Sequence, residues 1–303
     1  MSAERILIAM HDFAGGGTER IAVRLANEWS RRGRIVRIFC GHEHGPSRDL
    51  VSAKVEVGEA DPVIPRSLLS RGTLGVSLRQ EALAWQPDVV FGTGNFHLPV
   101  FAAYNAAGGS GAKTVCKLSN PLGLAGFVRL LAPAHSLGLR MLTKDIDALV
   151  AMSPALRNEA AHILKRPDLL MAPEPILGGT PAARLAAWQG QDPSPLIVCA
   201  GRLERQKNFS LALETFAALP PSLDARLAIL GEGSQRRLLE RQARRLGIAD
   251  RVHMPGHVPD VATWLRRATA FLSTSHYEGY PAVLVEAIAA GIPVITTDCS
   301  PAI

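Results

Sequence analysis

The sequence predicts an α/β protein built of two Rossmann-like domains, and three observations support this fold class. Short β-rich runs alternate with helical patterns along the chain, which is typical of parallel sheets with crossover helices. At 303 residues the chain is too long for one small domain and suits two α/β units. Prolines and glycines gather in residues 173–195, as in a linker between domains.

The first domain is expected over residues 1–172. Its first strand is predicted at residues 6–10, followed by a glycine loop at 14–17 and a helix at 18–32 whose apolar residues recur on one face. Further strands are predicted at residues 35–40, 89–91, 114–117, 148–151 and 169–171, and a further helix at 153–164.

The second domain is expected over residues 196–303 and repeats the alternation of strands and helices. A strand followed by six loop residues leaves it without a closing helix, so we expect this domain to be incomplete at its C-terminus. Its strands are predicted at residues 196–200, 225–230, 252–254, 270–273 and 294–297, and its helices at 208–219, 235–246, 261–267 and 281–290.

Composition and charge limit the classes of partner. The formal net charge is +6, which favours anionic partners such as nucleotides, phosphorylated lipids or an acidic membrane face. Aromatic residues make up only 5% of the chain and are not interleaved with basic residues as in proteins that bind single-stranded nucleic acid. We therefore expect no nucleic-acid partner.

Cysteine usage and hydropathy indicate the compartment. Cys40, Cys116, Cys199 and Cys299 are widely separated and form no CxxC pair, which predicts buried free thiols in a reducing compartment. The apolar run near the N-terminus is too short for a signal peptide, and no stretch has the length of a membrane span. These features predict a cytoplasmic protein.

Residues 275–291 carry the clearest chemical signal. They follow a predicted strand, and Pro281 begins an apolar helix. Because open α/β sheets bind ligands at the carboxyl ends of strands, Glu278 is expected at the edge of such a crevice. Glu286 is the lone carboxylate on the helix, and the hydroxyls of a bound ribose would be suitable partners for it. Taken alone, an ordinary salt bridge explains Glu286 equally well.

Residues 199–209 follow the first strand of the second domain and contain Arg202 and Lys207 after a glycine. A guanidinium fork and an ammonium group at this place are typical of diphosphate binding. The alternative, a surface loop with solvated charges, is disfavoured by the crevice position. After the next strand, Gly231 and Gly233 permit the backbone to approach a base or ribose closely, although such corners need glycine for turning in any case.

These stretches resemble glycosyltransferase family 4, the retaining enzymes of GT-B architecture with a Glu-x7-Glu pattern. The resemblance covers nearly the whole chain and implies two domains that face each other across a cleft, with the second truncated. It implies transfer of a hexose from a nucleotide sugar, such as a UDP- or GDP-sugar, to a hydroxyl acceptor without a metal cofactor. The matching stretches are GGGTERIAVRLANEW, GRLERQKNFSLALETF, the LGEG corner and HYEGYPAVLVEAIAAGIPVITTD.

Carried over by position, the resemblance assigns a role to each charged residue of the second domain. Arg202 and Lys207 would hold the donor diphosphate. Glu286 would bind the ribose, and Glu278 would lie beside the transferred sugar. Arg202, Lys207 and Glu278, together with a histidine of the first domain, are the residues expected to promote catalysis.

The resemblance also assigns backbone and first-domain positions. The backbone at Gly279 and Tyr280 would line the phosphate end of the donor. The loop that contains Gly16 and Gly17 would face the cleft beside the phosphates, although a tight turn explains these glycines as well. His97 is the candidate for contact with the donor sugar, and the alternative is a histidine that caps a helix. The glycine loop is not GxGxxG, which argues against a nicotinamide dehydrogenase.

The expected acceptor is a carbohydrate or a lipid-linked sugar, in the synthesis of bacterial surface polysaccharide, lipopolysaccharide or glycolipid. Residues 123–142 are mostly apolar and form either a core helix pair, the favoured interpretation, or an amphipathic patch on the inner face of the membrane. Two other functions stay open. One is a sugar-nucleotide epimerase or phosphorylase of the same architecture, and the other is a truncated, inactive protein that only binds its ligand.

Overall fold

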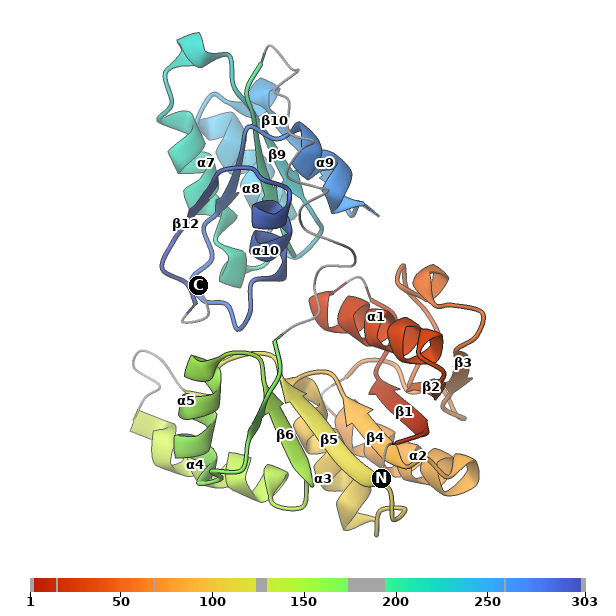
Figure 1. Ribbon diagram of the computed structural model, residues 1–303. Coiled ribbons are helices and arrows are strands. Elements are labelled where there is room, and N and C mark those ends of the chain that lie inside the picture. The colour runs from red at the N-terminus through yellow and green to blue at the C-terminus, as the bar shows by residue number, and fades with distance from the viewer. Residues whose placement is uncertain are drawn as a thin grey trace. The chain divides into compact units, whose positions relative to one another are not determined.

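The computed structural model describes residues 3–14, 16–67, 69–123, 130–173, 194–258 and 260–300. The described residues form two compact units, unit 1 up to residue 173 and unit 2 from residue 194. Each unit is a parallel sheet whose strands are connected mostly through helices (Figure 1). The predicted α/β class with two Rossmann-like domains is therefore confirmed. Most of the predicted linker, residues 174–193, lies outside the described residues.

Unit 1 contains a seven-stranded sheet in the order β3-β2-β1-β4-β5-β6-β7, and every pair in it is parallel. Its strands are β1 (Arg5–Met10), β2 (Ile35–Cys40), β3 (Glu56–Glu59), β4 (Val89–Gly92), β5 (Lys113–Leu118), β6 (Ala148–Ala151) and β7 (Leu170–Met171). Its helices are α1 (Gly17–Arg31), α2 (Ser70–Trp85), α3 (Leu98–Ala106), α4 (Ala132–Thr143) and α5 (Pro154–Leu164).

Strand β1 is apolar on both of its faces, as a strand covered by helices on each side must be. Ile8 and Met10 lie in one core cluster with Ala22 of α1. Leu7 and Ala9, which alternate with them, are also completely buried. The unbroken apolar run at the N-terminus therefore encodes a central strand.

Unit 2 contains a five-stranded parallel sheet in the order β10-β9-β8-β11-β12. Its strands are β8 (Leu196–Ala200), β9 (Arg226–Leu230), β10 (Val252–Gly256), β11 (Ala270–Ser273) and β12 (Val294–Thr296). Its helices are α7 (Phe209–Ala217), α8 (Arg236–Arg245), α9 (Val261–Arg267) and α10 (Ala282–Ala289).

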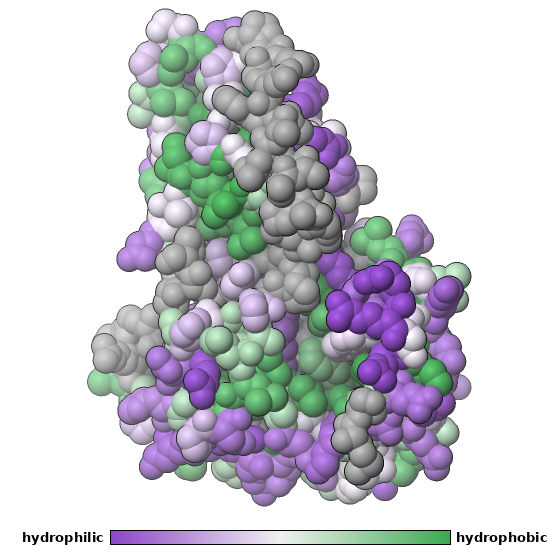
Figure 2. Space-filling view, viewed as in Figure 1, coloured by the Kyte–Doolittle hydropathy of each residue, from purple (hydrophilic) through white to green (hydrophobic). Residues whose placement is uncertain are grey.

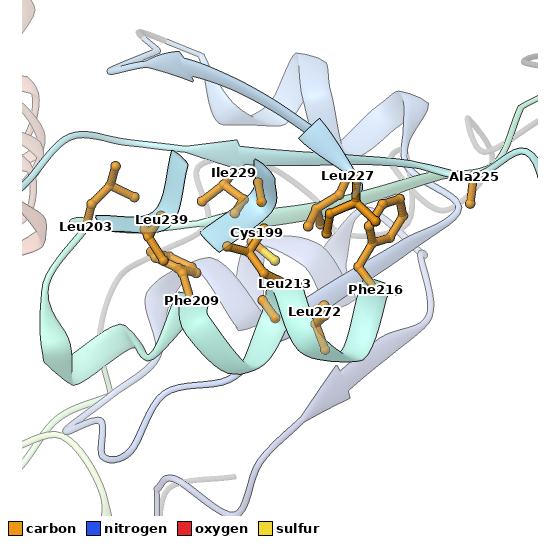
Figure 3. Close-up of a cluster of buried hydrophobic side chains, with 13 residues drawn as sticks. Cys199, Leu203, Phe209, Leu213, Phe216, Ala225, Leu227, Ile229, Leu239 and Leu272 are labelled. Atoms are coloured by element: carbon orange, nitrogen blue, oxygen red, sulfur yellow. The ribbon is translucent and has the colours of Figure 1, made fainter. Parts of the chain in front are cut away.

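Alternate residues of β8 and β9 face opposite cores of unit 2. Cys199 and Ile229 pack in a cluster with Phe216 of α7 (Figure 3). Val198 packs in a second cluster that includes Leu284 of α10. Helices thus cover both faces of the sheet. All four cysteines are buried and free, as predicted.

Helix α4 overturns the favoured prediction of core packing for residues 130–142 of the predicted segment 123–142. Leu137 and Met141 are 58% and 65% exposed, and Leu130, just before the helix, is 76% exposed. Together with the exposed Ala134, these residues recur at the spacing of one helical face, so α4 has an apolar face that is exposed to solvent. Most of the visible lower edge of unit 1 is hydrophilic (Figure 2). Residues 124–129 lie outside the described residues. None of the described helices combines the length and hydropathy needed to cross a bilayer.

Candidate functional site

Each sheet has one switch point, a pair of neighbouring strands whose following connections run toward opposite edges of the sheet. In unit 2 the connection from β8 runs to β9, and the connection from β11 runs to β12 on the other side. In unit 1, β1 and β4 are related in the same way, through β2 and β5. Open α/β sheets bind ligands at the carboxyl ends of the strands at such switch points. The loops after β8 and β11, and those after β1 and β4, are therefore the candidate site loops.

Hydrogen bonds hold the two loops of unit 2 against each other. The backbone N–H of His276 donates to the carbonyl oxygen of Gln206 at 2.8 Å. The side-chain amide of Gln206 donates in turn to the carbonyl oxygen of Tyr277 at 2.9 Å. Because these bonds flank Lys207 and Glu278, they bring the two side chains together from segments far apart in the sequence.

Lys207 and Glu278 form an ion pair between Nζ and Oε1. The hydroxyl of Ser275 donates to the same carboxylate oxygen at 2.6 Å. The side chain of Glu278 is only 9% exposed and that of Lys207 19%, so each charge depends on the other for compensation. The structure thus joins two of the predicted site residues directly.

Arg202, the second predicted cation, stands on the same loop but is exposed. Across the described ranges its guanidinium has no hydrogen-bond or ion-pair partner. Glu204, which lies close to it in sequence, instead accepts hydrogen bonds from the backbone N–H and hydroxyl of Ser234 at 3.0 and 2.7 Å. Arg202 is therefore available to an external anion.

The glycines after β9 lock two loops of unit 2 together. Gly231 has φ +140°, and a Cβ at this position would clash with the carbonyl oxygen of Gly201. A Cβ at Gly233 would lie 2.5 Å from the carbonyl oxygen of Leu203. Close approach by the neighbouring loop therefore requires both glycines, whether or not a base or ribose also approaches them.

The segment between Glu278 and α10 is compact. Gly279 is buried, and its carbonyl oxygen accepts a hydrogen bond from the hydroxyl of Ser300 at 3.3 Å. Tyr280 is partly buried, and Pro281 is the N-cap of α10, one residue before the helix begins. Glu286 lies partly buried on the helix itself.

In unit 1, Gly16 is the N-cap of α1 and Gly17 its first residue. Gly16 has φ −73°, which any residue adopts, and Gly17 is not among the glycines with positive φ. A tight turn therefore does not explain these glycines. A Cβ on Gly17 would meet nothing within 4 Å, so its missing side chain leaves space open at the helix start.

His97 ends a short 3-10 helix (Asn95–His97) after β4. It occupies the N-cap position of α3, yet its side chain makes no capping hydrogen bond, which removes the alternative of a capping histidine. The residue is 3% exposed, and neither ring nitrogen has a partner with hydrogen-bond geometry. Burial lowers the pKa of His97 to about 4, although the nearby backbone of Gly94 acts in the opposite direction.

A polar cluster beside the glycine loop has no counterpart among the predicted site residues. Arg66 donates from Nε and Nη2 to the two carboxylate oxygens of Asp12, both at 2.8 Å. Burial acts to raise the pKa of Asp12, but hydrogen bonds from His11 and Arg66 hold it well below its usual range. The pair is 54 residues apart, so no local pattern in the sequence could have indicated it.

The described part of the chain contains no group of three or more His, Cys, Asp or Glu side chains that could hold a metal ion. His42, in a histidine-rich loop after β2, is instead paired with Glu59, with its Nδ1 2.9 Å from the carboxylate.

Two family models match the chain, one within unit 1 and the other over unit 2 and the end of the predicted linker. Residues 16–164 match the glycosyl transferase 4-like domain. Residues 186–303 match the glycosyl transferases group 1. The first match includes the loop after β4 and begins at Gly16, at the end of the loop after β1, and the second includes the loops after β8 and β11.

Curated relatives share sequence with the chain to different extents. The lipopolysaccharide core biosynthesis glycosyltransferase LpsE of Rhizobium meliloti is 24% identical over 284 residues, which are 93% of this chain and 76% of LpsE. The Vi polysaccharide biosynthesis protein VipC/TviE of Salmonella typhi is 40% identical over 72 residues, which are 24% of this chain and only 12% of that protein.

Solved structures share the fold at low sequence identity. HepE of Anabaena, in complex with UDP and glucose, aligns with a TM-score of 0.76 and 18% identity over 98% of this chain and 81% of HepE. WaaG, a glycosyltransferase involved in lipopolysaccharide biosynthesis, aligns with a TM-score of 0.71 and 20% identity over 97% of this chain and 81% of WaaG.

Proposed function

Because the chain is a glycosyltransferase of the GT-B fold, we propose that it transfers a hexose from a nucleotide sugar to a hydroxyl acceptor with retention of the anomeric configuration. The pairing of Lys207 with Glu278 at the switch point of unit 2 carries this proposal. It sets a cation and a buried carboxylate at the edge where such sheets bind nucleotides, and the loop of Lys207 also bears the exposed Arg202.

The donor is proposed to bind unit 2 through its charged end. Arg202 would grip the diphosphate with its planar fork, and Lys207 would contribute a second positive charge. Glu286 would accept hydrogen bonds from the ribose hydroxyls. Glu278, which contacts Lys207, would meet the sugar next to the diphosphate.

Backbone groups would complete the donor site. The chain at Gly279 and Tyr280 passes beside Glu278 and would line the phosphate end. Gly231 and Gly233 let the adjoining loop pack against the backbone of the loop that bears Arg202 and Lys207. The UDP bound to HepE supports a nucleotide-sugar ligand for a fold of this kind.

Unit 1 would contribute neutral groups rather than charges. The imidazole of His97 is neutral at physiological pH because burial lowers its pKa to about 4. A neutral imidazole can both donate to and accept from a sugar hydroxyl. The open space at Gly17, next to Gly16, would let the backbone approach the donor phosphates.

In the proposed reaction the acceptor hydroxyl attacks the anomeric carbon from the face that the nucleotide leaves. The bond from this carbon to the diphosphate oxygen breaks as the new carbon–oxygen bond forms, and the hydroxyl proton passes to the departing phosphate oxygen. Arg202 and Lys207 would stabilise the charge that grows on the diphosphate, which is the largest electrostatic contribution to the rate. With two cations in this role, we propose that no metal ion is needed.

The acceptor is proposed to be a carbohydrate or lipid-linked sugar of a bacterial surface polysaccharide, lipopolysaccharide or glycolipid. The relative LpsE, which acts in lipopolysaccharide core biosynthesis, supports this class. The exposed apolar stripe of α4 supports peripheral contact with a membrane. Four buried free thiols support a reducing compartment, so we propose a cytoplasmic enzyme that meets its acceptor at the inner face of the membrane.

The test begins with a thermal-shift screen of the protein against UDP-, GDP- and ADP-sugars, because a bound donor stabilises the folded state by mass action. The stabilising donor is then supplied with a labelled sugar, an acceptor extract and EDTA. We expect label in a glycoside of the same anomeric configuration as the donor, determined by NMR coupling constants. Arg202→Ala should abolish transfer.

Other outcomes of this experiment distinguish the alternatives. An epimerised nucleotide sugar without acceptor would indicate an epimerase, and release of a sugar phosphate would indicate a phosphorylase. A glycoside of inverted configuration would refute retention. Donor binding without any product would indicate a protein that only binds its ligand.

A further inference from the structure

Arg66 connects three loops at the carboxyl edge of the sheet of unit 1. It belongs to the segment between β3 and α2. Its two hydrogen bonds to Asp12 reach the loop after β1, and a third, from Nη2 to Oε1 of Glu19 at 3.0 Å, reaches the first turn of α1. Its guanidinium also lies over the ring of Phe96 in the loop after β4, 5.6 Å from the ring centroid.

The two carboxylates that Arg66 binds stand on either side of the glycine loop. Asp12 precedes the loop and also accepts a hydrogen bond from the backbone N–H of Ala14 at 3.0 Å. Glu19 follows the loop and lies so close to Gly16 that a Cβ there would clash with its carboxylate. Arg66 therefore ties the entry of the loop to its exit.

The contact with Phe96 extends this connection to His97. The rings of Phe96 and His97 meet edge to face at 5.4 Å between centroids. Phe96 also meets the ring of His11, the neighbour of Asp12, with the ring centroids 5.5 Å apart. Loss of the Arg66 side chain would therefore remove contacts both at the glycine loop and at the turn that contains His97.

We propose that Arg66 is a positioning residue for sugar transfer, which holds the glycine loop and the His97 turn in one fixed arrangement. The inference rests on the proposed function, in which these two segments meet the donor. The core of unit 1 forms from β1, β2 and α1 without Arg66, so the residue serves the geometry of the loops rather than the fold. Lysine cannot replace it, because an ammonium group lacks the planar fork that binds both oxygens of Asp12.

The experiment compares Arg66→Lys and Arg66→Ala with wild type in steady-state transfer assays and in hydrogen exchange. Because a misplacement of about 1 Å can cost on the order of a hundredfold in rate, we expect kcat to fall roughly ten- to a hundredfold in both variants. The donor KM should change less than about threefold, since the charged donor contacts lie in unit 2. Amide exchange should accelerate in residues 12–20 and 94–98 alone.

Two further variants keep the result decisive. Arg31→Ala is the matched control, because Arg31 binds both oxygens of Glu28 at 2.8 Å in the same way, near the C-terminal end of α1. It should leave kcat and exchange in both loops unchanged. Glu19→Ala removes the acceptor of one of the three hydrogen bonds of Arg66. If the Arg66 variants do not fold, a smaller loss of kcat in Glu19→Ala supports the proposal, and wild-type kcat in this variant overturns it.

The proposal is overturned if the folded Arg66 variants keep wild-type kcat, or if Arg31→Ala lowers kcat as much. If wild-type protein transfers no sugar at all, the proposed function fails, and hydrogen exchange alone then tests the connection. Unchanged exchange in both loops of Arg66→Lys would exclude it.

Discussion

Lys207 and Glu278 compensate each other's charge at the switch point of unit 2, from positions 71 residues apart in the sequence. Each is a predicted ligand contact, and each is the other's partner in the protein alone. In the proposed complex, the donor diphosphate would therefore compete with the carboxylate of Glu278 for Lys207. The same ion pair also links the stability of unit 2 to the residues of its site.

We expect Lys207→Ala to lower the free energy of unfolding by about 3 kcal/mol, because it leaves the carboxylate of Glu278 buried with Ser275 as its remaining partner. The double variant Lys207→Met, Glu278→Leu removes both charges and should recover most of this loss. Urea unfolding measures both values. Arg205→Ala, an exposed cation of the same loop, is the control, and equal losses in the single and double variants would contradict the argument.

Arg202→Ala should weaken binding of UDP or GDP roughly ten- to a hundredfold with little change in stability, within about 0.5 kcal/mol. The reason is that Arg202 is exposed and its side chain makes no hydrogen bond or ion pair with the described residues. Calorimetric titration measures the affinity, and thermal unfolding measures the stability. Arg237→Ala, on the exposed face of α8, should change neither, and wild-type nucleotide affinity in Arg202→Ala would refute its role.

Gly231→Ala should lower the unfolding free energy by about 2 to 4 kcal/mol, since the new Cβ would clash with the carbonyl oxygen of Gly201 and the backbone has φ +140°. Gly247→Ala is the matched control. Gly247 also has positive φ, +69°, but a Cβ there meets nothing within 4 Å, so only about 1 kcal/mol should be lost. Equal losses in the two variants would show that backbone conformation alone accounts for the effect.

His97 should make the protein less stable in mild acid. Burial, assisted by the charges of His11 and Arg66, lowers its pKa from 6.5 to about 4, so between these values the unfolded chain binds more protons than the folded one. Stability is therefore full above pH 6.5 and falls as the pH drops, by about 2 kcal/mol between pH 7 and pH 5.

Urea unfolding at both pH values of wild type and His97→Gln tests this dependence. The variant should lose about 2 kcal/mol of the difference between pH 7 and pH 5. His162→Gln, which replaces an exposed histidine of α5, should retain the wild-type difference. An unchanged difference in His97→Gln would contradict the lowered pKa.

The exposed apolar face of α4, which includes Ala134, Leu137 and Met141, should bind membranes. The double variant Leu137→Glu, Met141→Glu should lower binding to phosphatidylglycerol vesicles at least about tenfold, because the exposed apolar face loses its contact with the acyl chains. Cosedimentation measures the binding. Leu223→Glu, an exposed leucine of unit 2, is the control, and transfer to a water-soluble acceptor should persist in all three proteins.

Periodicity and glycine positions were sufficient to predict most elements of both sheets, because buried strands and amphipathic helices leave regular patterns. Strand β3 and helix α2 are among the elements that escaped prediction. β3 reads Glu-Val-Gly-Glu, an edge strand with little apolar character, and α2 has apolar residues on several faces. Whether these two segments form a strand or a helix depends on contacts with residues distant in the sequence, which a local sequence window does not contain.

Of the candidate site, too, only a part could be predicted from the sequence. Lys207 and Glu278 could be predicted because each lies in a motif after a strand, but their mutual ion pair depends on the order of strands in the sheet. Arg66 could not be predicted, since it stands in an irregular segment and acts through residues on other loops. For α4, hydropathy alone does not distinguish a face that packs in the core from one that is exposed.

The backbone contact between Gly231 and Gly201 has an evolutionary consequence. Because the loops after β8 and β9 touch without intervening side chains, neither can accept a larger residue or a change of length unless the other adjusts. Across descendants of this sequence the two loops should therefore be inherited as one unit. In the proposed enzyme, a change of donor preference would then arise by substitutions outside the contact between these two loops and not within it.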